Sequence, residues 1–483
     1  MEYTGMKVLV AGLGLHGGGL ASARYLLSKG ADITVTDLRD EKTLAPSIER
    51  LEAACREIPG CPPVRYVLGR HETADFAEAD FVIKNPGVRT DSPFLQAARH
   101  IETDISLFLA KSPARLTAVT GTKGKSITSS ALHWVLKNAD RKGKAFLGGN
   151  IAVSPLTFLD DLTEDDDVVL ELSSWQLGDL KERRKKTGEP LLKPKAAIIT
   201  CFMSDHQDYY GSMKKYAADK RVIYQGQNSD DFTVLKDDDW GRDFLSETNG
   251  RPLLFSEAPL PEGTSGGWLE SQDAPGLVRL YGSVSPFLAD GETAELVPDK
   301  PLVPGYHQKQ NFLSAGLALL SLGLPVKTIW QGLKSFPGIE HRMEMFHTAG
   351  GIEFYNDSAA TIPEAAAAAI EALGSNTVLV CGGTDKDLDF SPLVQAAQKA
   401  KAVVLLAGTA GEKLRILLSE AGITFNGPFD SPEAAAAVAV EKAAAGDRVI
   451  LSPGCASFGM FLNEFDRGRR WKEIIKKAAG VGH

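Results

Sequence analysis

The chain has 483 residues, of which 43% are hydrophobic and 24% charged, and its formal net charge at neutral pH is -9. A chain of this length is too long to fold around a single hydrophobic core, so we expect two to four domains. The acidic balance argues against a general nucleic-acid binder, because such proteins carry a basic surplus.

The cellular location is constrained by the termini, the hydropathy and the cysteines. The N-terminus "MEYTGMKVLVAGLG" shows no basic segment followed by a long apolar one, so it does not resemble a secretory signal. No apolar run reaches the roughly 18 residues that a membrane span needs. The five cysteines form no C-x-x-C pair, which fits a reducing compartment better than a disulfide framework or a zinc site. We therefore expect a cytoplasmic protein without membrane insertion.

The first block of the chain alternates strand-like and helix-like segments. Residues 7–14, 32–38 and 80–88 are apolar strand patterns, and residues 17–30 have the pattern of a helix. This βαβ order predicts a parallel sheet. We place the first domain at residues 1–112.

The second block, residues 113–338, begins with "RLTAVTGTKGKS" and has further strand patterns at 167–173 and 195–202. Between about 230 and 303, short strand-like pieces alternate with Gly, Pro, Asp and Ser, which predicts inserted β-hairpins. Residues 311–323 are expected to form a buried helix.

The third block, residues 339–483, again alternates strand patterns such as "NTVLVCGG" and "KAVVLLAG" with alanine-rich helices. The predicted fold is therefore α/β with three domains. A Rossmann-like N-terminal domain is followed by a central P-loop ATPase-like domain with a β-hairpin insert and by a Rossmann-like C-terminal domain.

A glycine-rich turn follows the first strand. Gly12, Gly14 and Gly17 match G-x-G-x-x-G, and Asp37 stands where a dinucleotide enzyme binds the ribose hydroxyls. A tight turn that packs a strand on a helix needs the same glycines. Only about 105 residues precede the next phosphate loop, which is short for a complete NAD-binding fold. We favour another nucleotide-like ligand here and keep an NAD-dependent oxidoreductase as an alternative.

The stronger signal is "GTKGKS", although the first glycine of the usual G-x-x-x-x-G-K-[ST] pattern is replaced by Val119. The backbone N–H groups from Gly121 to Ser126 can surround phosphate oxygens at a helix N-terminus. Lys125 would meet the β- and γ-phosphates, and the Ser126 hydroxyl would reach Mg²⁺. The loop predicts binding of ATP or GTP.

Three polar residues follow strands of the same block. Glu171 ends one strand, His206 follows another, and Lys220 comes fourteen residues after His206. Alone, each has an ordinary interpretation: a capping acid, a turn histidine and an exposed helix lysine. Together they converge on the carboxyl edge of one sheet, where ligands of α/β proteins bind.

At this point the chain resembles the Mur ligases, and within them the glutamate-adding type. The resemblance extends over residues 12–468. It rests on "GLGLHGG", "GTKGKS", "GGNIAVSPL", "ELSSWQL", "DHQDYYGSMKKYAADK", "GYHQKQN", "HRME", "YNDSAAT", "CGGTDK" and "LSPGCASFGMFLNEFDRG".

The resemblance implies an enzyme that uses ATP to make an amide bond. A carboxylate is a poor electrophile, so the γ-phosphoryl group is transferred to it to give an acyl phosphate, which an amine then attacks. Positioning and charge neutralisation supply most of the catalysis in such a transfer. The implied reaction adds D-glutamate to UDP-N-acetylmuramoyl-L-alanine in peptidoglycan precursor synthesis, with ATP and Mg²⁺ as cofactors.

The resemblance also assigns roles to residues of this sequence. The implied catalytic residues are Lys125, Glu171, His206, Lys220 and Arg342. The implied metal ligands are Ser126, Glu171, His206 and Lys220, the last as a carbamate. The implied ATP contacts are Gly121, Thr122, Lys123, Gly124, Lys125, Ser126, Ile127, Asn311, Arg342 and Asp357. The implied contacts to the UDP substrate are Leu15, His16, Asp37, Leu38, Arg39, Asn85, Gly87, Asn150, Ser173 and Gln176. The implied glutamate contacts are Thr361, Lys386 and Ser457.

The sequence departs from the family pattern at several positions. Gln308 replaces an asparagine beside the adenine, Ala359 replaces a lysine, and Glu464 stands where an aromatic residue packs on the glutamate. Lys123 also replaces an asparagine. The alternatives are therefore the addition of L-glutamate or another amino acid and a folylpolyglutamate synthase-like activity. We expect a monomer whose partners are its small-molecule substrates, with no nucleic acid.

Overall fold

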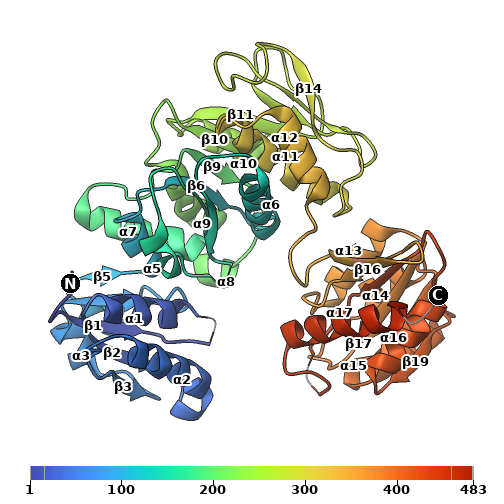
Figure 1. Cartoon of the computed structure of the whole chain (residues 1–483), viewed down its shortest axis with the longest axis horizontal. Coiled ribbons are helices and arrows are strands. Elements are labelled where there is room, and N and C mark those ends of the chain that lie inside the picture. The colour runs from blue at the N-terminus through green and yellow to red at the C-terminus, as the bar shows by residue number, and fades with distance from the viewer. Residues whose placement is uncertain (1, 16, 152, 458, 481–483) are drawn as a thin grey trace. The chain divides into compact units, whose positions relative to one another are not determined.

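The computed structural model describes residues 2–15, 17–151, 153–457 and 459–480 (Figure 1). The chain divides into two compact units. One consists of Met1–Glu270, Gly276–Val297 and Gln310–Gly332, and the other of Ser271–Pro275, Pro298–Lys309 and Leu333–His483. Two sheets lie in the first unit and one in the second. Among the described helices, none combines the length and the apolar character that crossing a bilayer requires.

The N-terminal sheet is entirely parallel, with the strand order β3-β2-β1-β4-β5. Its central strand β1 is apolar on both faces and is buried from Val8 to Ala11, as expected of a parallel sheet covered by helices. The short strands β3 and β5 were not predicted from the sequence. The strands are β1 (Lys7–Ala11), β2 (Asp32–Asp37), β3 (Arg65–Leu68), β4 (Phe81–Lys84) and β5 (Ile101–Glu102). The helices are α1 (Gly18–Ser28), α2 (Glu41–Glu57), α3 (Thr73–Glu78), α4 (Pro93–Gln96) and α5 (Asp104–Leu109).

Two cysteines of this first part are paired. Cys55 in α2 and Cys61 form a disulfide whose Cα atoms are 5.6 Å apart. The expectation that the cysteines stay reduced is therefore wrong for this pair. Cys201, Cys381 and Cys455 are free thiols.

The central sheet has nine strands in the order β14-β13-β12-β11-β10-β9-β6-β8-β7. Seven of them, from β12 to β7, run parallel, whereas β13 and β14 are antiparallel. The strands are β6 (Arg115–Thr120), β7 (Ala145–Gly149), β8 (Asp167–Glu171), β9 (Ala196–Ile199), β10 (Phe232–Lys236), β11 (Arg251–Ser256), β12 (Gly266–Trp268), β13 (Gly276–Arg279) and β14 (Thr293–Val297).

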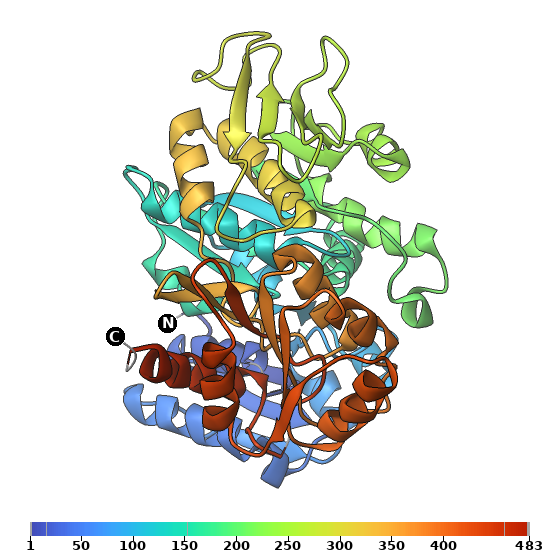
Figure 2. The ribbon, with the colours of Figure 1, turned by 90° about the vertical axis from the view of Figure 1, so that its right-hand side faces the viewer.

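The hairpin prediction for residues 230–303 is only partly right. Strands β12 to β14 are antiparallel neighbours, drawn in yellow-green at one end of the sheet (Figure 2). In contrast, β10 and β11 pair in parallel, since helix α10 (Asp239–Leu245) connects them. The remaining helices of this part are α6 (Lys125–Asn138), η1 (Pro155–Thr157), η2 (Leu159–Asp161), α7 (Ser174–Thr187), α8 (Gln207–Tyr210), α9 (Met213–Lys220), η3 (Arg221–Tyr224), α11 (Tyr306–Ser321) and α12 (Val326–Ser335).

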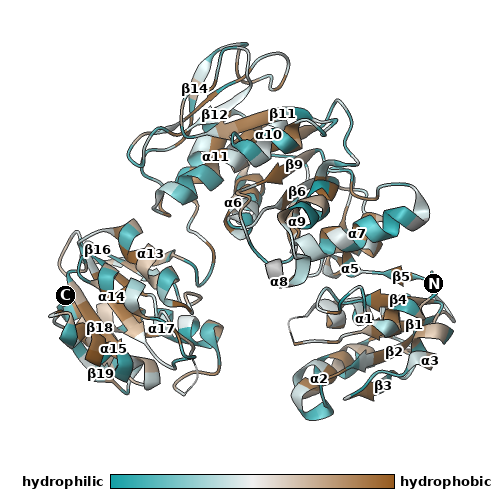
Figure 3. Cartoon of the chain, turned by 180° about the vertical axis from the view of Figure 1, so that it is seen from behind, coloured by the Kyte–Doolittle hydropathy of each residue, from teal (hydrophilic) through white to brown (hydrophobic). Residues whose placement is uncertain are grey.

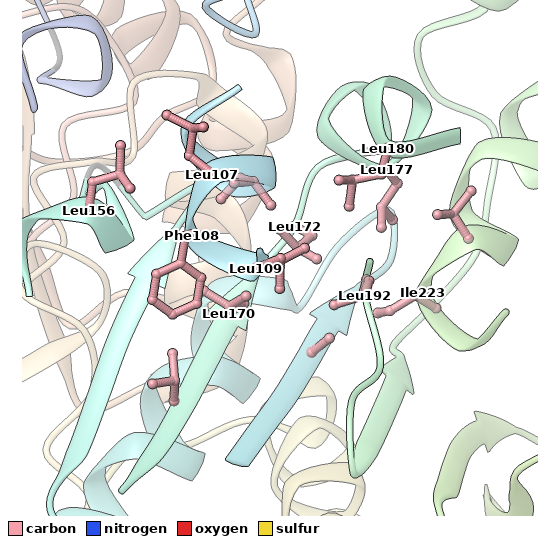
Figure 4. Close-up of a cluster of buried hydrophobic side chains, with 14 of the residues drawn as sticks. Leu107, Phe108, Leu109, Leu156, Leu170, Leu172, Leu177, Leu180, Leu192 and Ile223 are labelled. Atoms are coloured by element: carbon pink, nitrogen blue, oxygen red, sulfur yellow. The ribbon is translucent and has the colours of Figure 1, made fainter. Parts of the chain in front are cut away.

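One apolar core joins the N-terminal sheet to the central sheet. Helix α5 contributes Leu107 and Phe108, strand β8 contributes Leu170, and helix α7 contributes Leu177 and Leu180 (Figure 4). All of these side chains are at most 6% exposed. The two sheets therefore share buried surface and form one compact unit.

The C-terminal sheet has the order β15-β16-β20-β17-β18-β19, and only β15 is antiparallel. Its inner strands β17, β18 and β20 are apolar and almost fully buried, and strand β18 is among those coloured brown in Figure 3. Along β17, Leu379 and Cys381 pack in one core and Val378 and Val380 in the other, as the period of a strand requires. The strands are β15 (Glu344–Ala349), β16 (Ile352–Asn356), β17 (Thr377–Gly382), β18 (Ala402–Leu406), β19 (Asn426–Phe429) and β20 (Arg448–Leu451). The helices are α13 (Pro363–Leu373), α14 (Ser391–Ala397), α15 (Thr409–Glu420), α16 (Pro432–Glu441) and α17 (Glu464–Gly480).

The contact between helix α1 and the glycine-rich turn leads to a stability prediction. A Cβ atom at Gly19 would lie 2.2 Å from the carbonyl oxygen of Gly12 and 2.8 Å from Leu13 Cα. Backbone atoms cannot move away as a side chain can. We expect Gly19→Ala to lower the free energy of unfolding by about 1–3 kcal/mol, the usual cost of overpacking, as measured by chemical denaturation.

The neighbouring Gly18 provides the control. A Cβ atom there would meet nothing closer than Asn85 Nδ2 at 3.8 Å. Because alanine favours helix by about 1 kcal/mol over glycine, Gly18→Ala should be neutral or stabilising. Equal losses of stability in both variants would contradict the steric explanation.

Candidate active site

The phosphate loop connects strand β6 to helix α6 and depends on two glycines. Gly121 has φ 148°, and a Cβ atom there would lie 1.9 Å from Thr200 Oγ1. Gly124 has φ 85°, and a Cβ atom there would lie 2.2 Å from Asn311 Oδ1. Both positions therefore require glycine for their backbone conformation and for close packing. The second contact also places Asn311 of helix α11 directly against the loop.

The residues after strand β9 hold the loop from one side. The Thr122 N–H donates to Cys201 O at 2.7 Å, and the Thr122 hydroxyl donates to Met203 O at 3.1 Å. The Thr200 hydroxyl donates to Lys123 O at 2.6 Å. These bonds fix the loop before any ligand binds, so the N–H groups at the start of α6 are preorganised for an anion.

Lys125 begins helix α6 and turns back onto the loop. Its Nζ donates to Gly121 O at 3.1 Å and to Thr122 O at 2.9 Å. Burial lowers the pKa of Lys125, although the Glu171 carboxylate acts in the opposite direction. Phosphate oxygens would be stronger partners for this ammonium group than neutral carbonyls are.

Lys220, at the end of helix α9, also contacts this loop. Its side chain is 1% exposed, and Nζ donates to Gly121 O at 2.8 Å and to Thr120 Oγ1 at 3.2 Å. Nζ also lies 4.8 Å from the centre of the Tyr216 ring. Burial lowers the pKa of Lys220 to about 7, with the positive charge of Lys125 adding to the effect.

Glu171 ends strand β8 beside the loop and is 1% exposed. Its Oε1 accepts a bond of 3.1 Å from Asn150 Nδ2, whereas its buried Oε2 has no hydrogen-bond partner. An unpaired buried carboxylate oxygen fits a cation such as Mg²⁺, which prefers oxygen ligands. In the described part of the chain, no group of three or more His, Cys, Asp or Glu residues is arranged to hold a metal.

His206 stands between strand β9 and helix α8 with a left-handed backbone, φ 51°. Its ring centre lies 5.3 Å from that of Trp175 and 6.2 Å from that of Tyr216. Because Tyr216 also lies under Lys220, His206 belongs to the same neighbourhood as the loop. The structure thus brings Lys125, Glu171, His206 and Lys220 together at the carboxyl edge of the central sheet, with Ser126 and Ile127 in the first turn of α6.

The carboxyl edge of the N-terminal sheet gathers a second set of expected residues. Asp37 ends strand β2 and is 6% exposed. Its Oδ2 accepts a bond of 3.1 Å from the Gly14 N–H, and its Oδ1 accepts one of 3.0 Å from the Arg39 N–H. The carboxylate therefore shapes the glycine-rich turn.

Asn85 follows strand β4 and supports the same turn. Its Nδ2 donates to Gly12 O at 3.3 Å, and its Oδ1 accepts from the Gly87 N–H at 3.1 Å. Leu15 and Leu38 are 43% and 66% exposed. The expected contact His16 lies outside the described residues.

The start of helix α7 carries two further expected contacts. Ser173 is the N-cap: its hydroxyl accepts from the Gln176 N–H, and Gln176 Oε1 accepts from the Ser173 N–H at 2.9 Å. This reciprocal capping fixes both side chains. Asn150 is held close to strand β8, since its N–H donates to Glu171 O at 2.8 Å.

The second unit holds the remaining expected residues at the carboxyl edge of its own sheet. Asp357 follows strand β16 and is 7% exposed; its carboxylate accepts from the Met343 N–H at 3.0 Å and from the Ser452 hydroxyl at 2.6 Å. Burial raises the pKa of Asp357 to about 7, against the charge of Arg342 nearby.

The expected glutamate contacts come from three loops of this edge. Ser457, 4% exposed, follows strand β20, and Lys386, which is exposed, follows strand β17. A backbone bridge between Thr384 and Ala456, with N···O distances of 3.0 and 3.1 Å, holds these two loops together. Thr361 precedes helix α13 in the third loop.

Sequence reasoning missed Arg467 in helix α17. This side chain is 1% exposed. It donates to Ser358 O at 2.8 Å, to Ser358 Oγ at 2.9 Å and to Cys455 O at 3.3 Å. Burial lowers its pKa to about 10. Arg467 thus ties the loop of Asp357 to the loop of Ser457, and only its place in the "DRG" motif hinted at this role.

Three family models match successive parts of the chain. They are the MurD-like N-terminal domain of the Mur ligases over residues 6–106, the Mur ligase middle domain over 119–259, and the glutamate ligase domain over 341–455. Together with the three α/β sheets, they show that the chain belongs to the Mur ligase family, a family of ATP-dependent amide-forming ligases. The fold class and the family expected from the sequence are confirmed.

Within that family, the relatives are of the MurD type. The chain is 40% identical to the UDP-N-acetylmuramoylalanine–D-glutamate ligase of Treponema pallidum, with 98% of each chain covered. It is 37% identical to the ligase of the same name from Roseiflexus sp., with 99% of each covered. Among solved structures, the UDP-N-acetylmuramate–alanine ligase MurC of Thermotoga maritima matches with a TM-score of 0.57 at 21% identity, covering 98% of this chain and all of that one.

The buried guanidinium leads to a second stability prediction. Arg467 donates from three separate nitrogens, Nε, Nη1 and Nη2, whereas a lysine has one nitrogen on a differently shaped side chain, so Arg467→Lys leaves buried acceptors without a donor. We expect a loss of about 2–4 kcal/mol in the free energy of unfolding, because each such group costs about 1–3 kcal/mol. Chemical denaturation of the full chain measures this.

The same helix offers a matched control. Arg470 is 52% exposed and bonds to Asp466 at 3.2 Å. Arg470→Lys should change stability by less than about 0.5 kcal/mol, as expected of exposed ion pairs. A loss in Arg467→Lys no larger than that of the control would rule out the tethering role.

Proposed function

We propose that this chain is the ATP-dependent ligase that joins D-glutamate to UDP-N-acetylmuramoyl-L-alanine in peptidoglycan precursor synthesis. The observation that carries the proposal is similarity along nearly the whole chain, at 31–40% identity, to ligases of that name. Membership of the Mur ligase family also replaces the alternative of an NAD-dependent oxidoreductase.

The proposed reaction begins at the phosphate loop. The γ-phosphoryl group of ATP moves to the alanyl carboxylate, which gives an acyl phosphate and ADP. The glutamate amine then attacks the acyl carbon, a C–N bond forms, and phosphate leaves. Lys125 and the N–H groups of residues 121–126 would stabilise the charge on the transferring group, and Arg342 would add a second cation.

When bound, Mg²⁺ would supply positive charge that neutralises the phosphate oxygens. The proposed ligands are Ser126, Glu171, His206 and Lys220 as a carbamate. The unpaired Oε2 of Glu171 supports this assignment, since a bound cation would satisfy it.

The proposed substrate contacts remain those of the sequence analysis. ATP would also meet Thr122, Lys123, Ile127, Asn311 and Asp357. The UDP substrate would meet Leu15, His16, Asp37, Leu38, Arg39, Asn85, Gly87, Asn150, Ser173 and Gln176, and glutamate would meet Thr361, Lys386 and Ser457. The corresponding domains are proposed at residues 1–112, 113–338 and 339–483. We further propose that the protein is cytoplasmic, because ATP and nucleotide sugars are intracellular metabolites, and that it acts as a monomer.

A second candidate is a ligase of the same type that adds L-glutamate or another amino acid. Ala359 and Glu464 favour it, since they depart from the family pattern around the incoming amino acid. ADP release measured with UDP-N-acetylmuramoyl-L-alanine and a panel of D- and L-amino acids distinguishes the two. In the presence of the nucleotide sugar, we expect ADP release with D-glutamate and with no other amino acid of the panel. ADP release with L-glutamate, or without the nucleotide sugar, would refute the proposal.

The environment of Lys220 leads to a rescue prediction. A free ammonium group would repel a nearby Mg²⁺, but with a pKa near 7 the neutral amine is populated and can take up CO₂ as a carbamate. We expect Lys220→Ala to lower kcat at least about 100-fold, because the negative charge of the carbamate is lost from the site. Acetate should restore part of the activity, because its carboxylate replaces that charge. An alkylamine should not restore activity.

Lys215→Ala, an exposed position of the same helix, is the control and should leave kcat unchanged. Rescue by the amine and not by acetate would show that Lys220 acts as a protonated lysine.

A further inference from the structure

A buried ion pair joins the N-terminal sheet to the central one. Lys84, the last residue of strand β4, places Nζ 2.8 Å from Asp179 Oδ2 of helix α7. The two side chains are 3% and 6% exposed. Removing two charges from water to this extent costs several kcal/mol per ion, so such a pair contributes little net stability. What it does provide is a fixed orientation of the groups that carry it.

Another ion pair crosses between the same two sheets at the surface. Lys29, directly after helix α1, lies 2.8 Å from Asp160 of η2, but Asp160 is 60% exposed. Exposed pairs are worth about 0–1 kcal/mol and tolerate movement. A third pair, Arg183 Nε of helix α7 with Glu102 Oε2 of strand β5 at 2.9 Å, has side chains that are 19% and 7% exposed. The Lys84–Asp179 pair is therefore the most buried of the three.

The buried pair lies between two groups of residues with related roles. Lys84 is adjacent to Asn85, whose amide bonds to the glycine-rich turn and to Gly87. Asp179 lies one helical turn after Gln176, which caps α7 through Ser173. The pair therefore joins the 85–87 turn to the start of helix α7.

We propose that the Lys84–Asp179 pair is a positioning device for the nucleotide-sugar substrate, because it sets the distance between Asn85 and Gln176 across the site. This inference rests on the proposed function, in which both residues contact that substrate. Neither Lys84 nor Asp179 is among the residues proposed to contact the reacting groups. They would affect only the affinity for the nucleotide sugar, through the relative positions of Asn85 and Gln176.

The surroundings of Asp179 explain why the lysine matters more than the acid. Burial raises the pKa of Asp179 to about 6, and the nearby charges of Asp219 and Asp104 act in the same direction, while Lys84 opposes them. Removing Lys84 leaves a buried carboxyl group among acids, which favours movement of α7 away from β4. Removing both charges relieves that conflict.

The test compares Michaelis constants for the two nucleotides in ADP release. For Lys84→Met we expect the KM for UDP-N-acetylmuramoyl-L-alanine to rise at least about tenfold, because misplacement by about 1 Å costs up to 100-fold, while the KM for ATP changes less than about threefold. The double variant Lys84→Met/Asp179→Asn should have a smaller rise than the product of the two single ones. Lys29→Met/Asp160→Asn is the matched control and should leave both constants within about twofold.

Calorimetric titration of each variant with the nucleotide sugar, without ATP or glutamate, gives a second readout. The titration should show weaker binding of the nucleotide sugar by Lys84→Met and unchanged binding by the control variant. If Lys84→Met does not fold, Lys84→Arg, which keeps the charge at a different length, should still bind the nucleotide sugar more weakly than the wild type does in the same assays. Unchanged nucleotide-sugar affinity, or equal rises in both KM values, would overturn the proposal. A wild type that releases no ADP with D-glutamate would instead refute the proposed function, and the titration would still decide the role of the pair.

Discussion

Two lysine ammonium groups share one backbone carbonyl, and the central part of the molecule is organised around that contact. Lys125 and Lys220 both donate to Gly121 O, at 3.1 and 2.8 Å. Burial lowers the pKa values of both lysines, and the positive charge of Lys125 lowers the pKa of Lys220 further. An anion in the loop, or a carbamate on one lysine, relieves the conflict. Strands β6 and β9 fix the loop and so hold both lysines at this carbonyl, which favours the binding of a negatively charged ligand.

The rest of the fold repeats one geometric rule. In parallel sheets the carboxyl ends of all strands meet at a single edge, so residues directly after strands come together there. Asp37 and Asn85 do so in the N-terminal sheet, and Asp357 and Ser457 in the C-terminal one. This explains why strand patterns were sufficient to predict the fold class and why Asp37 could be located from the glycine-rich pattern, whereas Asn85, Asp357 and Ser457 were located only through the family resemblance. The positions of these residues follow from the fold, whereas their contacts with ligands are proposals for experiment.

The features that escaped prediction depend on long-range packing. Lys84 and Asp179 are separated by 95 positions, and Arg467 and Ser358 by 109. In a sequence, a lysine at a strand end or an arginine in a helix is most simply exposed, and nothing local shows its burial. The turn-rich composition around strand β11 likewise could not tell a parallel strand from a hairpin. The pairing of Cys55 with Cys61 was missed because compartment arguments say nothing about proximity.

The buried polar groups of this protein fall into two kinds that do different work. Arg467 and the Lys84–Asp179 pair have their hydrogen-bond partners within the protein, so their burial fixes loops and strands relative to one another. Glu171 Oε2 has no partner, and Lys220 has a pKa shifted far from that of an exposed lysine. A fold keeps such unfavourable groups only where something else removes the cost, and perturbed groups cluster at functional sites for that reason. Glu171 and Lys220 both lie beside the phosphate loop, so a ligand bound there would offset their cost and complete the site.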